Sequence, residues 1–268
     1  MARTIVVAGK GGTGKTTVAA LIIKYLRENE CGSILALDAD PDANLGTVLG
    51  IPVEKTIGDL REETLGQIKN LPPGMSKMNY IEAGLHQIVV ETDKVDLITM
   101  GRGEGPSCYC YVNNLLRKFA EYLMNSYDWL VMDTEAGLEH LSRSTAARID
   151  DLIVVVSESP LGMDCARRIA EMTPTLKNPV GRSFFVMNSV RDDHAAAIRE
   201  AGEKLGLKYL GAVPRDPAIE DLVFNRESIC KLNGSPAASS INEIMQALLA
   251  PQPASHQGAT LTIRRLTP

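Results

Sequence analysis

Long apolar runs are missing from this chain of 268 residues. None approaches the roughly 20 residues that a helix needs to cross a bilayer. The opening segment MARTIVVAGKGG has only a short apolar stretch that runs straight into glycines, unlike a secretory signal peptide. We therefore expect a cytoplasmic protein without a membrane partner.

A basic stripe is missing as well. The formal net charge is −5, the sequence pI is about 5.5, and lysines and arginines are scattered, usually beside acids. Proteins that bind nucleic acid present a concentrated positive surface to its phosphates. We therefore expect no nucleic-acid partner.

Cysteine is scarce, with five residues and no C-x-x-C motif. Thiols stay reduced in the cytoplasm, so five cysteines do not indicate a disulfide framework. Cys31, Cys165 and Cys230 stand alone near apolar neighbours, and we interpret them as small buried hydrophobic residues or inert surface thiols. Cys108 and Cys110 lie one residue apart in the stretch GPSCYC and need a separate explanation.

Strand-like and helix-like segments alternate along the chain, which predicts βαβ units and a mostly parallel sheet. We expect an α/β fold, doubly wound, with helices on both faces of the sheet. Residues 1–250 form one domain in this interpretation, and residues 251–268 a polar tail. The expected strands are TIVVA, SILAL, KVDLITM, WLVMD, LIVVV, RSFFVMN and YLGAVP. The expected helices are 15–29, 112–125, 161–176, 192–205 and 239–249, with only short helical pieces in 51–92.

A phosphate loop follows the first strand. Residues 9–16 read GKGGTGKT and fit G-x-x-x-x-G-K-[ST] at every fixed position, with a strand before and a helix after them. Glycines let backbone N–H groups turn inward around phosphate oxygens. Lys15 should reach the β and γ phosphates, and the Thr16 hydroxyl should bind Mg²⁺. The residues expected to contact nucleotide here are Gly11, Gly12, Thr13, Gly14, Lys15, Thr16 and Thr17.

Acidic residues follow two of the expected strands. Asp38 and Asp40 lie in LALDADPDANL, and Asp133 ends the hydrophobic strand in WLVMDTEAG. Carboxylates at the carboxyl ends of strands lie where an open α/β sheet binds its ligands. An acidic turn or a helix cap is the alternative for Asp38 and Asp40.

The motif KGGTGKT resembles the deviant Walker motif of the SIMIBI nucleotide-binding proteins, a class that includes MinD, ParA and the nitrogenase iron protein. The resemblance implies a homodimer in which Lys10 reaches the partner's nucleotide, in the manner of an arginine finger. It also implies that Asp40 orients the attacking water, and that Asp38 and Asp133 hold Mg²⁺ directly or through water.

ATP is the expected nucleotide. A guanine site of the NKxD type needs an aspartate, but Arg191 stands at that position after Asn188, and arginine is only a donor. Asn188 can still pair with the amino group and N7 of adenine. The stretch AVPRDP resembles the segment that lines adenine in the same class, which adds Pro214, Arg215 and Asp216 to the expected site.

The cysteine pair indicates a metal site shared by two subunits. Two thiols cannot complete the four-coordinate site that zinc and related thiophilic ions prefer. A two-fold dimer would supply Cys108 and Cys110 twice, giving four sulfurs around one Ni²⁺ or Zn²⁺ ion. A chance pair is the alternative, since C-x-C is a weak signal by itself.

The order KGGTGKTT, DADPDANL, CYC, MDTEAGLEHLSR and VPRDP resembles the CooC-type accessory ATPases over nearly the whole chain. The resemblance implies an ATP-hydrolysing metallochaperone that delivers nickel to carbon monoxide dehydrogenase or acetyl-CoA synthase. It maps the family's metal pair onto Cys108 and Cys110, and a further family segment onto Thr134–Arg143. We interpret His140 in that segment as structural or signalling rather than as a nickel ligand.

Related functions fit less well. A nitrogenase-type iron protein needs a cysteine just after Asp133, an Mrp-type iron–sulfur scaffold needs C-x-x-C, and a MinD-like membrane switch needs a terminal amphipathic helix. None of these is present. A ParA- or MinD-like dimerisation switch without metal cargo remains the alternative function.

Overall fold

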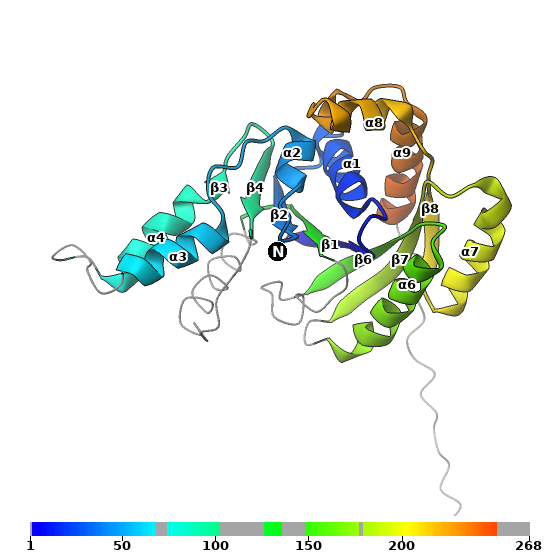
Figure 1. Cartoon of the computed structure of the whole chain (residues 1–268), viewed down its shortest axis with the longest axis horizontal. Helices are drawn as coiled ribbons and strands as arrows, with labels where there is room; N and C mark the ends of the chain where they lie inside the picture. The colour runs from blue at the N-terminus through cyan, green and yellow to red at the C-terminus, as the bar shows by residue number, and fades with distance from the viewer. Residues whose placement is uncertain are drawn as a thin grey trace, which may run out of the picture.

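The structure is a computed structural model, and it describes residues 2–67, 74, 76–101, 126–135, 148–176 and 179–250. These residues form an eight-stranded sheet of order β3-β4-β2-β5-β1-β6-β7-β8 (Figure 1). Every neighbouring pair is parallel except β3 and β4. The strands are β1 Arg3–Gly9, β2 Ile34–Ala39, β3 Val89–Val90, β4 Val95–Thr99, β5 Trp129–Thr134, β6 Ile149–Val156, β7 Val180–Asn188 and β8 Lys208–Val213.

Helices cover both faces of this sheet. Along β1, Ile5 and Val7 pack into one core with α1 (Lys15–Glu28) and α9 (Pro236–Leu249), while Val6 and Ala8 pack into the other with α6 (Pro160–Met172) and α7 (Asp192–Lys204). This alternation follows from the two-residue period of a strand that is buried on both sides, and it confirms the doubly wound fold. The helices are α1 Lys15–Glu28, α2 Leu45–Leu49, α3 Ile57–Gln67, α4 Lys77–Gln87, α6 Pro160–Met172, α7 Asp192–Lys204, α8 Pro217–Phe224 and α9 Pro236–Leu249, with 3₁₀ turns η1 Thr173–Thr175 and η2 Ile229–Lys231.

The expected elements are largely present. All seven expected strands form, and four of the five expected helices lie within a few residues of their predicted bounds. The expected helix 112–125 and the tail 251–268 lie outside the described residues. The sequence did not predict β3, α2 or α8, and it predicted only fragments where α3 and α4 each run for 11 residues. No helix within the described ranges is long and apolar enough to span a membrane.

A buried carboxylate ties three strands to the last helix. Asp151 of β6 is fully buried and accepts from Arg3 Nε at 2.9 Å and from Arg182 Nε at 2.6 Å. Both guanidinium groups also donate to the Leu248 carbonyl at 3.1 Å. The amino ends of β1, β6 and β7 are thereby joined to the end of α9.

We expect Asp151→Asn to lower the free energy of unfolding by about 2–4 kcal/mol, because two partly buried guanidinium groups lose their counter-ion. Urea denaturation followed by circular dichroism would measure the change. Glu171→Gln is the matched control, since its pair with Arg167 is exposed and should contribute less than about 1 kcal/mol. Equal losses in the two variants would contradict the role of Asp151.

Candidate functional site

The loop between β1 and α1 is closed by hydrogen bonds of its own. The Thr13 backbone N–H and hydroxyl both donate to the Lys10 carbonyl, at 3.2 Å and 2.8 Å. Gly12 and Gly14 have φ values of 81° and 87°, in the left-handed region that favours glycine. No side chain caps the start of α1 at Gly14, so its free N–H groups are available to an anion.

The two lysines of the loop are placed differently. The Lys15 side chain is buried, and its Nζ lies 3.4 Å from the Lys10 carbonyl. A buried ammonium whose hydrogen bond within the described residues goes to a neutral carbonyl favours an incoming anion such as a phosphate. Lys10 is half-buried, and its own ammonium makes no hydrogen bond or ion pair with any residue in the described part of the chain.

Two carboxylates stand opposite each other beside this loop. Asp38 in β2 and Asp133 in β5 are register partners, and β5 pairs with β1, which leads into the loop. Both side chains are fully buried. Asp38 accepts hydrogen bonds from the backbone N–H groups of Asp40 at 3.1 Å and Leu45 at 2.8 Å. Neither oxygen of Asp133 has a hydrogen-bond partner among the described residues.

The electrostatics of this pair favour a cation. Burial raises the pKa of Asp133 to about 7, and the negative charge of Asp38 raises it further. The nearby Thr16 hydroxyl and the positive charge of Lys15 lower this pKa. Thr16 does not reach hydrogen-bonding geometry with Asp133. Burial also raises the pKa of Asp38 to about 6, against its two backbone donors. Hydroxyl and carboxylate oxygens are ligands that Mg²⁺ prefers. Thr16, Asp38 and Asp133 therefore fit a magnesium ion.

Asp40 lies in the turn that follows β2. Its carboxylate accepts from the Asp42 N–H at 3.0 Å, and its carbonyl accepts from the Ala43 N–H at 3.0 Å. Ala43 has a φ of 52°, which is unusual for a residue with a side chain. These contacts and the two bonds to Asp38 hold the turn in one shape, with Asp40 half-buried beside the carboxylate pair.

Of the residues predicted to surround the base, some contact the phosphate loop and others do not. Asn188, the last residue of β7, donates from Nδ2 to the Thr13 carbonyl at 2.8 Å and so contacts the loop. The Arg215 side chain instead pairs with Glu220 of α8 at 2.6 Å and is exposed. Pro214 follows β8 directly.

The Asp216 side chain caps two helices. It accepts from Ala218 N–H at the start of α8 and from Ala237 N–H at the start of α9, at 3.0 Å and 3.1 Å. Burial works to raise its pKa, but the nearby Ser235 hydroxyl and the hydrogen bonds from these two N–H groups outweigh burial and hold the pKa below its usual range. A role in base binding would thus fall to its backbone.

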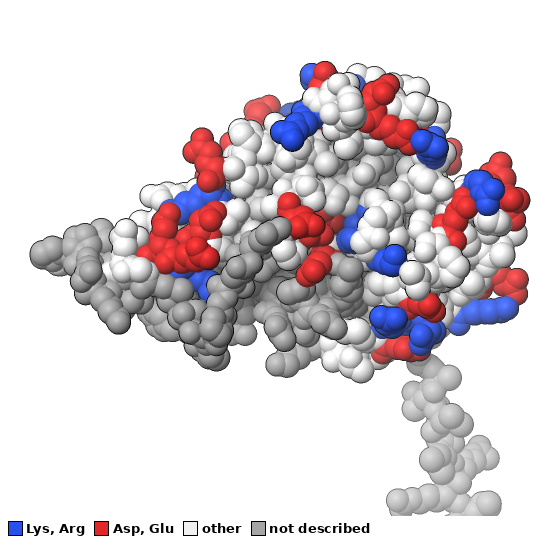
Figure 2. All heavy atoms as spheres, in the orientation of Figure 1, with Lys and Arg blue, Asp and Glu red and all other residues white. Residues whose placement is uncertain are grey.

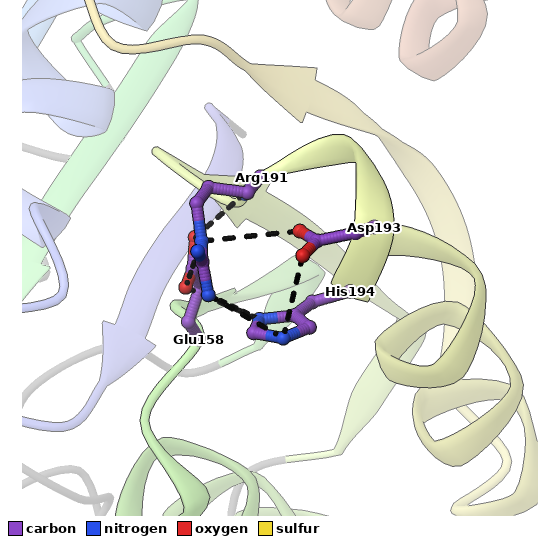
Figure 3. A network of polar contacts seen from close by, with 4 residues as sticks. All are labelled: Glu158, Arg191, Asp193 and His194. Carbon is purple, nitrogen blue, oxygen red and sulfur yellow. Dashed lines mark hydrogen bonds and ion pairs between the residues drawn. The ribbon is translucent and has the colours of Figure 1, made fainter.

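Sequence reasoning missed the partners of Arg191, which Figure 3 shows at the start of α7. Its backbone N–H and Nε donate to Glu158 at 2.7 Å and 3.1 Å, and Nη2 lies 3.3 Å from the His194 ring (Figure 3). The Asp193 carboxylate lies 3.8 Å from Arg191 Nε. Glu158 comes two residues after β6, and an acid just past a strand was the available signal. Arg191 is thus held by protein groups at the position of a guanine-specific aspartate.

The predicted metal pair cannot be placed. Cys108, Cys110 and His140 lie outside the described residues, as does most of Thr134–Arg143. Within the described ranges, no cluster of three or more His, Cys, Asp or Glu side chains forms a metal site. The other three cysteines are free and half-buried.

Comparison with known proteins places the loop and acids in a family. Residues 4–229 match the CobQ/CobB/MinD/ParA nucleotide-binding domain. The chain belongs to this family. It is therefore a MinD/ParA-type P-loop protein, as the loop motif predicted.

Individual relatives agree with the family. An uncharacterised ATP-binding protein of Methanocaldococcus jannaschii is 42% identical over 219 residues, covering 81% of this chain and 86% of the relative. The carbon monoxide dehydrogenase accessory protein CooC of Rhodospirillum rubrum is 27% identical over 264 residues, covering 91% and 95%. The septum site-determining protein MinD of Pyrococcus horikoshii, solved with Mg-ADP, has a TM-score of 0.65 at 21% identity, covering 92% and 96%. This last likeness shows the MinD/ParA fold.

Proposed function

We propose that this MinD/ParA-type protein is a Mg²⁺-dependent ATPase that acts as a homodimer. The observation that carries the proposal is Asp133, a fully buried carboxylate without a hydrogen-bond partner in the described part of the chain. Such a group is costly unless a cation accompanies it. It lies on the strand next to the one that leads into the phosphate loop.

The chain's own groups account for each part of hydrolysis. Lys15 and the loop N–H groups bind the β and γ phosphates. Thr16, Asp38 and Asp133 would hold Mg²⁺, which neutralises phosphate charge when bound. Asp40 orients a water whose oxygen bonds to the γ phosphorus. The bond from that phosphorus to the β–γ bridging oxygen breaks, and ADP, inorganic phosphate and a proton released to solvent are the products.

Lys10 completes the site from the second copy. Its charge has no partner in the described part of its own chain. Positive charge that arrives only on closure stabilises the transition state without holding the product tightly. Hydrolysis is therefore coupled to dimerisation.

We further propose that the cargo is nickel, delivered to carbon monoxide dehydrogenase or acetyl-CoA synthase. Two features support this: the likeness to the accessory protein CooC over 91% of the chain, and the pair Cys108 and Cys110. Four thiolates from two subunits suit square-planar nickel and tetrahedral zinc alike, so zinc is the alternative resting occupant.

We expect the dimer to bind one Ni²⁺ ion, and Cys108→Ser/Cys110→Ser to lose it while still binding ATP. Thiolate ligation also predicts that affinity rises with pH until the thiols are ionised. Thiolate-to-metal absorption during a nickel titration, with light scattering for the dimer, would measure both. Cys31→Ser/Cys230→Ser is the matched control, because both cysteines are free and half-buried. Unchanged stoichiometry in the first double variant would refute the cargo site.

A switch without metal cargo is the second candidate, favoured by the MinD likeness of the fold. A DNA-partitioning version would need a basic surface. On the face drawn in Figure 2, the basic side chains of the described residues are interspersed with acidic ones and cover no broad area alone. Binding to DNA at physiological salt, without nickel binding, would favour this candidate.

A further inference from the structure

A side chain that is distant in sequence forms a hydrogen bond to the phosphate loop. Asn188 donates from Nδ2 to the Thr13 carbonyl at 2.8 Å, across 175 residues of sequence. A Cβ atom at Gly14 would lie only 2.2 Å from the same nitrogen. The amide of Asn188 therefore packs directly against two consecutive residues of the loop, and the glycine at position 14 makes room for it.

The backbone that presents Asn188 is firmly held. Asn188 ends β7, which pairs with β6 on one side and with β8 on the other, where Asn188 opposes Val213. The next residue, Ser189, has a φ of 54° and donates its N–H to the Val213 carbonyl at 2.8 Å. A left-handed residue with a side chain costs about 1 kcal/mol or more and persists where its surroundings enforce it. The chain thus turns sharply straight after Asn188.

The chemistry of the contact fixes the amide. A carbonyl only accepts, so the NH₂ end of Asn188 must face Thr13. One of its N–H groups is therefore committed to the loop before any nucleotide arrives. Interpreting Asn188 solely as a group that contacts adenine leaves this bond unexplained.

We propose that Asn188 is a positioning residue for phosphate binding: it holds the Thr13 carbonyl outward so that the loop N–H groups stay turned toward the phosphates. The proposal rests on the proposed function, because it assigns the support of that same site. It predicts that Asn188 matters for a ligand that has no base.

Inorganic tripolyphosphate with Mg²⁺ is the probe that separates the two roles. We expect Asn188→Ala to weaken tripolyphosphate and ATP alike, by about tenfold, as the loss of one ordering hydrogen bond implies. Isothermal titration calorimetry would measure both affinities. Asn29→Ala is the matched control, because Asn29 Nδ2 also donates to a backbone carbonyl, that of Tyr25, at 2.9 Å, at the other end of α1.

A variant that weakens ATP but keeps the parental affinity for tripolyphosphate would overturn the proposal and leave Asn188 as a base contact. If the parent itself binds neither ligand, the proposed function fails, and the loop is tested without ligand. Hydrogen exchange of residues 9–17 should then be faster in Asn188→Ala than in the parent and in Asn29→Ala. Asn188→Asp, of equal size, gives the same test should the alanine variant not fold. Unchanged exchange in the folded variants would contradict the proposal.

Discussion

Asp133→Asn should stabilise the nucleotide-free protein by on the order of 3 kcal/mol at about pH 8 while abolishing Mg²⁺-dependent ATP hydrolysis. The gain arises because the parent buries a carboxylate without a hydrogen-bond partner among the described residues. The loss arises because the neutral amide is a far poorer ligand for Mg²⁺ than the carboxylate. Stability and activity are thus expected to move in opposite directions.

The stabilisation should depend on pH in a defined window. Burial raises the pKa of folded Asp133 to about 7, from 3.8 when the group is free. Below about pH 4 both states are protonated and the carboxylate costs nothing extra. Between about pH 4 and 7 the folded state holds the proton and the unfolded state does not, so the parent loses stability as pH rises. Above about pH 7 the full cost is present.

Urea titrations of parent and variant across this window would measure the difference. Asp151→Asn makes the same substitution at another fully buried aspartate, but one that two arginines hold. It should destabilise the protein. If Asp133→Asn destabilised the protein as much as Asp151→Asn does, the interpretation of Asp133 as an uncompensated carboxylate that binds a cation would be wrong.

Lys10→Ala should leave ATP affinity within about threefold of the parent and lower turnover by about 10² to 10³. The reason is that Lys15, not Lys10, lies buried against the loop of its own chain. With ATP bound, the variant should stay monomeric in light scattering, because the γ phosphate has lost its partner across the dimer.

Two control variants accompany this prediction. Lys15→Ala should lose ATP binding itself, and Lys208→Ala, at an exposed lysine that begins β8, should change neither property. A Lys10→Ala protein that dimerises with ATP and hydrolyses it at the parental rate would exclude a role for Lys10 in the partner's site.

The sheet was predictable because its strands are buried on both faces and therefore stand out as continuous apolar runs. Two elements show the limit. β3 has only two residues, too few for any pattern. α8 begins with Asp216 as N-cap and Pro217 in its first turn, which is a normal start signal. That signal was missed because the same residues were assigned to the base site.

The candidate site was predictable where it is local in sequence. The loop motif and the acids after strands indicate their place without knowledge of the fold. Contacts between distant segments could not be predicted from the sequence. Asn188 contacts Thr13 across 175 residues, and Arg191 contacts Glu158 across 33. A motif also does not tell which atoms are engaged, as Asp216 shows by capping two helices with its carboxylate.

Mixing two inactive variants tests whether hydrolysis is shared between subunits. In a dimer of Lys10→Ala, each site keeps its own Asp40 but receives no lysine from the partner. In a dimer of Asp40→Ala, each site receives Lys10 from the partner but lacks its own Asp40. A mixed dimer contains one complete site and keeps one of the two Lys10 contacts. An equimolar mixture should therefore recover turnover above that of either variant alone, and no more than about a quarter of the parental value, which is the share that random pairing would give. A mixture no more active than the two variants measured separately would contradict a lysine that acts on the partner's nucleotide.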